Sequence, residues 1–237
     1  QLGISTGTEG LIFQNTATHR NTSSLIVAHE DEPATTLFEM TRLFYDELPL
    51  ALKPMKRYSN RDELWFENPR EWERKVKPGL RSRIRVATAR NLKIGRGKTI
   101  HNVHLSEMAF YADAKTLLAG LMNTVPSRPG TLIVGESTGN GVGGYWYELV
   151  MAARDGENEW TLLFFPWFED PDYRMSREEG AAYLDEGRLV LDEEERSLRN
   201  AFGLDDEQLI WRRRAIANLC GGDLAIFHQE YPATLEE

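Results

Sequence analysis

Short apolar runs alternate with longer segments of helical periodicity, and this alternation is the feature that most constrains the fold. Apolar runs predict strands at Ser24–Ala28, Glu63–Glu67, Ile84–Thr88, Thr99–Leu105, Thr131–Gly135 and Trp160–Phe165. Helical spacing predicts helices at Ile4–Ala17, Pro33–Leu48, Ala114–Asn123, Gly144–Arg154, Arg177–Glu186, Asp192–Asn200 and Asp205–Leu219. Such a pattern is typical of an α/β protein with a mostly parallel sheet flanked by helices, here followed by a helical C-terminal segment.

Composition narrows the class of protein further. No apolar run approaches 18 residues, so we expect no membrane span. The single cysteine, Cys220, excludes a disulfide scaffold and a multi-cysteine zinc site, and fits a reducing compartment. The chain begins at Gln1 without a visible signal peptide, and we expect it to be a fragment whose start lies upstream.

The net charge of −9 hides a strongly basic segment. Residues 53–98 hold 15 basic and 5 acidic side chains, whereas the rest of the chain is acidic. Such a block can present a phosphate-attracting face, with Arg81, Arg83, Arg85 and Arg90 as candidates for DNA contact. The alternative is a solvated surface whose cations pair with the acidic remainder.

Loops that follow parallel strands are where such sheets bind ligands, and the first suggestive loop is residues 1–6. Gly3, Ser5 and Thr6 fit the end of a phosphate-binding loop, which leads into a helix N-terminus. Ile4 stands where the usual lysine belongs, and a capped helix start explains the same residues. Residues 97–99 spell a similar ending, but a strand rather than a helix is predicted after them, so we reject that match.

Two further strand ends carry polar residues. Glu107 could orient an attacking water after the strand at Thr99–Leu105, and Ser106 could hold a metal-bound water. Glu107 as a first-turn helix residue is the alternative. The loop at residues 135–141 (GESTGNG) could reach a γ-phosphate or its sensor network, or could be a generic turn.

The histidines do not form a recognisable metal site in the sequence. His101 and His104 lie three apart on a predicted strand, so they point to opposite faces and make a poor chelate. No Ser/His/Asp arrangement can be assigned from spacing. Metal-hydrolase chemistry is therefore not supported.

Taken together, these loops resemble the ATPase domain of the large terminase subunit of tailed bacteriophages. The matching segments are residues 1–6, Ser24–Glu32, Arg96-Gly97, Val103–Tyr111, Glu136–Gly141, Phe165–Tyr173 and Phe227–Pro232. Ile4 and Ser106 depart from the family pattern, in which a lysine and an aspartate are commoner. The resemblance implies a P-loop fold of the RecA or helicase type, with an ATPase core at residues 1–174 and a helical part at residues 175–237 that leads to an absent nuclease domain.

The resemblance also implies roles for individual residues. ATP and Mg²⁺ are the expected cofactors, Glu107 the catalytic carboxylate, and Arg96 a candidate for stabilising transition-state charge. Phosphates would be bound by Gln1, Leu2, Gly3, Ser5 and Thr6. Metal binding would involve Ser5 and Ser106, and coupling of hydrolysis to DNA movement would involve Ser137, Thr138, Gly139, Asn140 and Gly141.

The expected partners are double-stranded phage DNA, the portal protein, the small terminase subunit and further copies of the chain in a ring, with no membrane. The expected location is the host bacterial cytoplasm, transiently on the procapsid portal. Two alternatives stay open: a helicase-like translocase outside packaging, and a prophage-remnant assembly protein that does not hydrolyse ATP. Ile4 and Ser106 favour the second.

Overall fold

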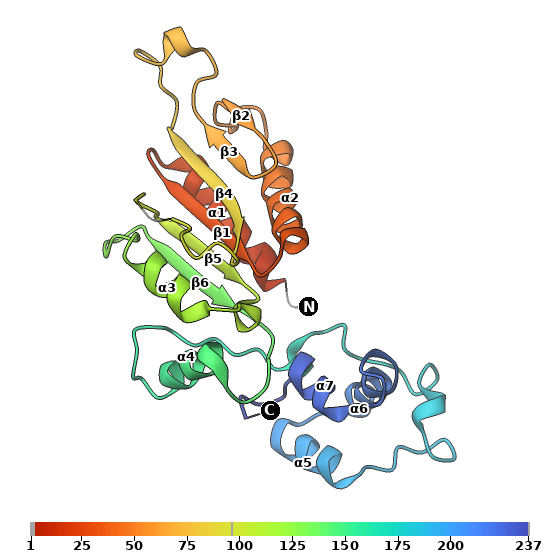
Figure 1. The fold of residues 1–237 in the computed structure, drawn as a ribbon. Helices are drawn as coiled ribbons and strands as arrows, with labels where there is room; N and C mark the ends of the chain where they lie inside the picture. Colours follow the sequence, from red (N-terminus) through yellow and green to blue (C-terminus); the bar gives the residue numbers. More distant parts are fainter. Residues whose placement is uncertain (1–2, 96, 237) are drawn as a thin grey trace. The chain divides into compact units, whose positions relative to one another are not determined.

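A six-stranded sheet lies in the first part of the computed structural model, which describes residues 3–95 and 97–236 (Figure 1). The strands, in sheet order, are β2 (Tyr58–Ser59), β3 (Glu63–Phe66), β4 (Ser82–Thr88), β1 (Ser23–Ala28), β5 (Asn102–Ser106) and β6 (Leu132–Glu136). Strands β4, β1, β5 and β6 are parallel, whereas β3 pairs antiparallel with β4, and β2 with β3. The predicted α/β class with a mostly parallel sheet is confirmed.

Strand β1 lies inside the sheet because its sequence is apolar on both faces. Leu25, Ile26 and Val27 are each at most 2% exposed. A continuous apolar run of this kind suits a parallel strand that is covered on both sides. Val27 lies opposite Ala87 of β4 and Leu105 of β5, so the carboxyl ends of the three strands meet at one edge.

Helices α1 (Ile4–Thr18) and α2 (Asp31–Glu47) pack against the sheet and against each other. Phe13 of α1 and Phe38 of α2 share an apolar core with Ile26 and Ile84. The predicted apolar face of α2 contributes to this core, with Leu37 buried and Met40, Phe44 and Leu48 partly buried. Two further helices follow, α3 (Ala114–Met122) and α4 (Gly144–Arg154).

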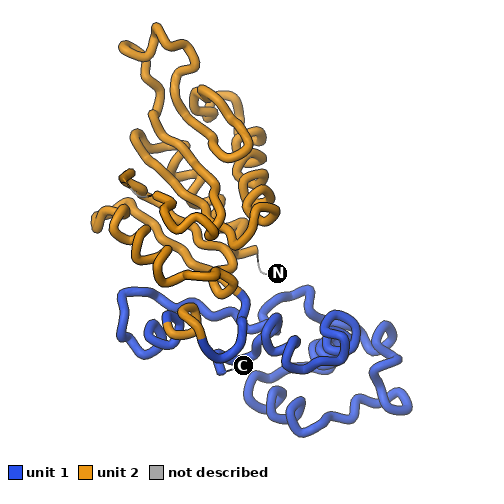
Figure 2. Tube along the Cα trace, viewed as in Figure 1, with its two compact units in different colours: residues 1–2, 138–143, 149–237 blue, residues 3–137, 144–148 orange. Residues whose placement is uncertain are grey.

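The chain forms two compact units (Figure 2). One contains residues 3–137 and 144–148, and the other contains residues 138–143 and 149–236 of the described chain. The predicted functional division at residue 174 stays a prediction. None of the described helices combines the length and the apolar character needed to span a membrane.

The second unit is held together by aromatic packing between helices α5 (Glu193–Phe202), α6 (Asp206–Arg214) and α7 (Leu224–Glu230) and the loops around them. The Trp211 ring stacks on Trp167, with centroids 5.3 Å apart, and on Tyr173, with centroids 4.2 Å apart. Asp192 and Asp205 cap α5 and α6, each in a reciprocal capping box.

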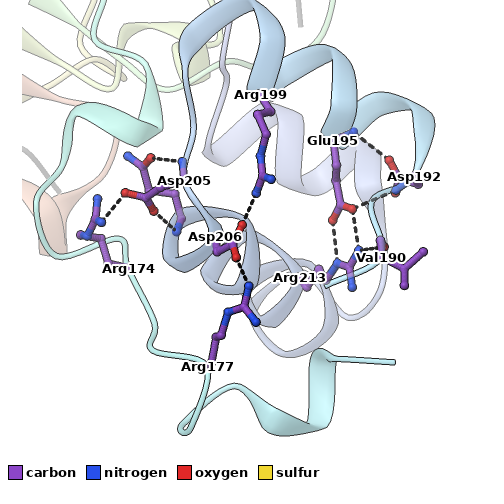
Figure 3. A network of polar contacts seen from close by, with 10 residues as sticks. Arg174, Arg177, Val190, Asp192, Glu195, Arg199, Asp205, Asp206 and Arg213 are labelled. Atoms are coloured by element: carbon purple, nitrogen blue, oxygen red, sulfur yellow. Dashed lines mark hydrogen bonds and ion pairs between the residues drawn. The ribbon is translucent and has the colours of Figure 1, made fainter. Parts of the chain in front are cut away.

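Ion pairs also join segments of this unit (Figure 3). Asp206 at the start of α6 binds Arg177 and Arg199, and Glu195 of α5 binds Arg213. The side chain of Glu195 is 1% exposed, so its pairing with Arg213 satisfies a charge that would otherwise be costly to bury.

Several predicted elements of this second unit differ in the structure. Residues 160–165 form no strand, because no described strand pairs with them, and Leu163 is 72% exposed. Only Ala181–Tyr183 is helical, as a 3-10 turn, within the predicted helix Arg177–Glu186. Gly180 approaches α6 so closely there that a Cβ would lie 2.1 Å from Cγ2 of Ile210, and this packing replaces regular helix.

Other boundaries shift by a few residues. The predicted helix Asp205–Leu219 is α-helical to Arg214 and continues as a π-helix over Ala215–Leu219. The strand predicted at Thr99–Leu105 is β5, which begins at Asn102. The short strand β2 and the helix α7 were not predicted.

Candidate functional site

The carboxyl edge of the parallel sheet gathers the polar residues that the sequence places after its strands. Ser106 ends β5 and Glu136 ends β6, and the two residues pair in register. Glu107 and Ser137 follow them directly. The start of α1 reaches the same edge, since the Ser5 hydroxyl donates a hydrogen bond to Oε1 of Glu136 at 2.8 Å. Ser5, Glu107 and Ser137 were predicted to act together, and the structure brings them to one place.

Helix α1 begins at an open N-terminus. Gly3 has a left-handed backbone with φ of 67°, which glycine adopts at little cost. Among the described residues no side chain caps the helix, and no acidic residue lies in its first turn. The Glu136 carboxylate, which accepts the Ser5 hydroxyl, is instead the negative charge that lies beside the positive end of the helix dipole. Thr6 contacts Sδ of Met40 at 3.8 Å through its hydroxyl. Gln1 and Leu2 lie outside the described residues.

Glu107 and Ser137 are joined directly. The Ser137 hydroxyl donates to Oε2 of Glu107 at 3.2 Å and accepts the backbone N–H of Ala109, also at 3.2 Å. Glu107 has a left-handed backbone with φ of 57°. That conformation is uncommon outside glycine, and it turns the chain from β5 into the short helix at Met108–Phe110. The loop after β6 therefore holds the carboxylate of the loop after β5.

A buried network of charged groups lies beneath this edge, and the sequence did not predict it. His104 of β5 is hydrogen-bonded to Oε1 of Glu9 through Nδ1 at 2.6 Å and to Oε1 of Glu136 through Nε2 at 3.2 Å. Glu9 in turn accepts the hydroxyl of Thr41 on α2 at 3.0 Å. The side chains of Glu9 and His104 are fully buried. The sequence feature that could have indicated this network is Glu9, because it places a carboxylate on the apolar face of a predicted helix.

The network keeps His104 charged. Burial alone would lower the pKa of His104, but the hydrogen bonds and charges of Glu136 and Glu9 outweigh it and raise the pKa to about 9. Burial alone would raise the pKa of Glu136, but the hydrogen bonds from His104, Ser106 and Ser5 outweigh burial and lower the pKa of this carboxyl. An imidazolium at His104 hydrogen-bonded to the Glu136 carboxylate is therefore the expected state at neutral pH.

Ser106 and Ser5 both donate to the same carboxylate, Glu136. Oxygen donors of this kind, hydroxyl and carboxylate, are the ligands that Mg²⁺ prefers. The hydroxyl and carboxylate oxygens at this edge are therefore of the chemical type that binds a hard divalent cation. No cluster of three His, Cys, Asp or Glu side chains suited to a metal occurs in the described part of the chain.

The coupling residues after Ser137 pass from one compact unit to the other. The boundary between the two units falls between Ser137 and Thr138. Within the second unit, the Gly139 N–H donates to the carbonyl of Gln229 on α7 at 3.2 Å, and a Cβ at Gly139 would lie 3.3 Å from that oxygen. Gly141 has φ of 76°, which favours glycine. Asn140 follows Gly139 in the same loop.

The basic block does not form one patch. Arg81 precedes β4 and Arg90 follows it, so the length of the strand, roughly 20 Å, separates them. Arg90 is paired with Glu30 at 3.1 Å, which agrees with the solvated-surface alternative for this residue.

Arg83 and Arg85 lie inside β4, and Arg83 is 3.6 Å from Glu63. Burial and the neighbouring charges of Arg85 and Arg83 lower the pKa of Lys98, so a local positive cluster does exist. Arg81 and Arg85 form no ion pair with any residue that the structure describes. Arg96 lies outside the described residues.

The two histidines have separate environments. His101 accepts the N–H of Ser23 through Nδ1 and contacts Arg128 through Nε2, whereas His104 joins the buried network. They do not share a ligand site.

Comparisons with known proteins bear on the fold of the chain. No family model matches the sequence, and no curated protein is similar to it. Among solved structures, a variant of the ATPase domain of the Thermus phage P74-26 large terminase superposes with a TM-score of 0.57 at 16% identity, over 98% of this chain and 84% of that one. The HK97 bacteriophage large terminase superposes with a TM-score of 0.60 at 12% identity, over 98% of this chain and 44% of that one. The chain therefore has the fold of the ATPase domains of phage large terminases.

Proposed function

We propose that this chain is the ATP-hydrolysing motor domain of a phage large terminase, which drives double-stranded DNA into a procapsid. The observation that carries the proposal is the hydrogen bond from Ser137 to Glu107, at the edge where Ser5 and the open start of α1 also lie. Phosphoryl transfer needs such parts: donors for phosphate, oxygen ligands for a metal and a positioned carboxylate. The shared fold supports the same function.

Nucleotide binding would use the start of α1. Gly3, Ser5 and Thr6 would contact the phosphates of ATP through backbone N–H groups and hydroxyls, continuing from Gln1 and Leu2. Ser5 and Ser106 would hold Mg²⁺, directly or through water, and bound Mg²⁺ neutralises phosphate charge.

Catalysis would depend on Glu107, which we assign to orienting the attacking water. Ser137 would hold the Glu107 carboxylate in place, and Arg96 would stabilise transition-state charge in its own or a neighbouring subunit. An arginine in that role is worth roughly 10³–10⁵ in rate.

Coupling to DNA would use the loop from Ser137 through Thr138, Gly139 and Asn140 to Gly141. This loop connects the two compact units covalently, which supports a role in transmitting the nucleotide state of the ATP site from one unit to the other. Arg83 and Arg85, beside Lys98, are the part of the basic block that we propose for DNA contact, with Arg81 as a further candidate.

The remaining proposals follow from the terminase assignment. The partners would be the portal protein, the small terminase subunit and other copies of this chain in a ring. The ATPase core would extend over residues 1–174, with a helical part at residues 175–237. The site of action would be the host bacterial cytoplasm, on the procapsid portal.

Calorimetry and ATP-turnover measurements on the protein test the assignment. We expect the protein to bind a non-hydrolysable ATP analogue with Mg²⁺ and to hydrolyse ATP faster when double-stranded DNA is added. Binding without hydrolysis would favour the non-hydrolysing assembly protein, which Ile4 and Ser106 support. Strand separation on a forked duplex would favour a helicase-like translocase.

A further inference from the structure

The buried Glu9–His104–Glu136 network is the largest set of charges at the site that the proposed function does not use. Two carboxylates and one imidazole are removed from water here, with Glu9 and His104 fully buried and the Glu136 side chain 18% exposed. Burying charge is costly unless every charge is paired and hydrogen-bonded. Simple packing of α1 against β5 would be achieved by apolar side chains, so the network calls for a specific role.

We propose that Glu136 is a positioning residue that links the nucleotide-binding start of α1 to the catalytic carboxylate Glu107, and that His104 and Glu9 hold Glu136 in place. This inference rests on the proposed function. It assigns a role to Glu9 and His104, which lie outside the expected phosphate, metal and coupling sets, and a specific role to Glu136, the first residue of the matching segment Glu136–Gly141.

The link is short because Glu136 and Ser137 are consecutive. Successive residues at the end of a strand point to opposite sides, and these two have different partners. Glu136 accepts the hydroxyl of Ser5 on α1, whereas Ser137 donates to Glu107 after β5. A change at Ser5 can therefore reach Glu107 through a single peptide unit.

The support of Glu136 is rigid on its other side. His104 binds the same oxygen, Oε1, that accepts the Ser5 hydroxyl. Glu9 fixes the opposite nitrogen of the His104 ring, and Thr41 of α2 fixes Glu9. Strand β5 thus holds Glu136 directly through His104, and helices α1 and α2 support His104 through Glu9 and Thr41, which is the kind of support that a positioning residue requires.

A phosphate bound at the start of α1 would compete with Glu136 for the hydroxyl of Ser5. Loss of that hydrogen bond would leave Glu136 held by His104 and Ser106 alone, and the adjoining Ser137 would respond. The predicted consequence is that nucleotide binding alters the backbone of residues 136–141 as well as that of α1.

Hydrogen exchange on the complete protein tests this link. In the wild type, a non-hydrolysable ATP analogue with Mg²⁺ should change amide exchange both at the start of α1 and across residues 136–141. Glu136→Ala should keep the change at α1 and lose the change at residues 136–141. Glu136→Gln should retain both, because its amide oxygen can accept the two hydrogen bonds that Oε1 accepts.

Steady-state kinetics of ATP hydrolysis by the same variants provide a second test. We expect Glu136→Ala to lower kcat for ATP hydrolysis about tenfold or more with KM within about threefold, a coupling of typical size. The exposed Glu157→Gln is the matched control and should match the wild type. Retention of the exchange response at residues 136–141 in Glu136→Ala would overturn the inference. Absence of nucleotide binding in the wild type would instead overturn the proposed function.

Discussion

Ser137 holds Glu107: its hydroxyl donates to Oε2 of the carboxylate at 3.2 Å and joins the ends of two neighbouring parallel strands. The residue before Ser137 contacts the start of α1, and the residue after it belongs to the other compact unit. Ser137 therefore lies where the proposed catalytic carboxylate, a helix N-terminus and the chain connection between the two units meet. The first prediction concerns this contact.

Removing the Ser137 hydroxyl should free Glu107 without changing its charge. We expect Ser137→Ala to reduce DNA-stimulated ATP turnover by roughly 10- to 150-fold, because a hydrogen bond to a charged group contributes about 1.5–3 kcal/mol. Steady-state turnover of the complete protein, with and without double-stranded DNA, measures this. The exposed Ser59→Ala serves as the control, and wild-type turnover in Ser137→Ala would show that the contact has no catalytic role.

Replacing His104 should destabilise the first unit strongly. His104→Leu leaves Glu9 and Glu136 buried without their cationic partner, and breaking a buried pair in this way costs about 3–5 kcal/mol. The free energy of unfolding from urea denaturation measures the loss. The exposed His19→Leu should change it by less than about 0.5 kcal/mol. A comparably small effect of His104→Leu would contradict the description of the network as paired charges.

Asp206 should make the second unit sensitive to acid (Figure 3). Hydrogen bonds from Arg177 and Arg199 lower the pKa of Asp206 in the folded protein. A lowered folded-state pKa gives stability that is present above the unfolded value of about 3.9 and is lost as the pH falls through the folded value.

The test compares Asp206→Asn with the wild type over a range of pH. At pH 7 the variant should be less stable by about 0.5–1 kcal/mol, the usual contribution of a partly exposed ion pair. The difference should begin to shrink as the pH falls below about 4, where the carboxylate of the unfolded wild type becomes protonated, and should shrink further as the pH falls through the lower folded-state pKa. A difference that stays constant from pH 7 to pH 3 would show that the ion pairs are not its cause.

The cations of β4 should contribute to DNA affinity through phosphate contacts. We expect Arg85→Gln to weaken DNA binding and to lower the slope of log affinity against log salt by about 0.9 for each phosphate contact removed. Basal ATP turnover should stay unchanged, because β4 contributes no side chain to the Glu107–Ser137 contact. Fluorescence anisotropy with a labelled duplex at several salt concentrations measures the slope.

Arg90→Gln is the internal comparison for that experiment. Arg90 already pairs with Glu30, so its removal should change the salt slope less than removal of Arg85. Equal slopes for both variants and the wild type would remove β4 from the DNA-contacting surface. Equal losses of basal and DNA-stimulated turnover would assign the arginine to folding.

The sequence predicts most strands of the sheet well because each of them is marked by a short apolar run that can be recognised without knowing which strand pairs with it. Ser24–Ala28 is an apolar run whose burial on both faces needs no knowledge of partners, and the strand ends place Glu107 and Ser137 at one edge. Residues 160–165 have the same apolar character, yet no described strand pairs with them, so composition alone was insufficient there.

The buried network shows what local reasoning misses. Glu9 and His104 lie 95 positions apart in the chain, and neither has a motif around it that indicates the other. The prediction that His101 and His104 point to opposite faces of the strand agrees with their separate environments but gave no partner for His104. A similar limit applies to Gly180, whose close approach to Ile210 depends on the packing of α6.

The measurement that tests the central claim most directly is ATP turnover by the complete protein and its Glu107→Gln variant, with and without double-stranded DNA. Glutamine keeps the size of the side chain and can accept the Ser137 hydroxyl, but it lacks the charge needed to orient the attacking water. We predict DNA-stimulated turnover in the wild type, and a loss of about 100-fold or more in Glu107→Gln with nucleotide affinity retained. The exposed Glu47→Gln should match the wild type. Undiminished turnover in Glu107→Gln would contradict the assignment of Glu107 as the catalytic carboxylate.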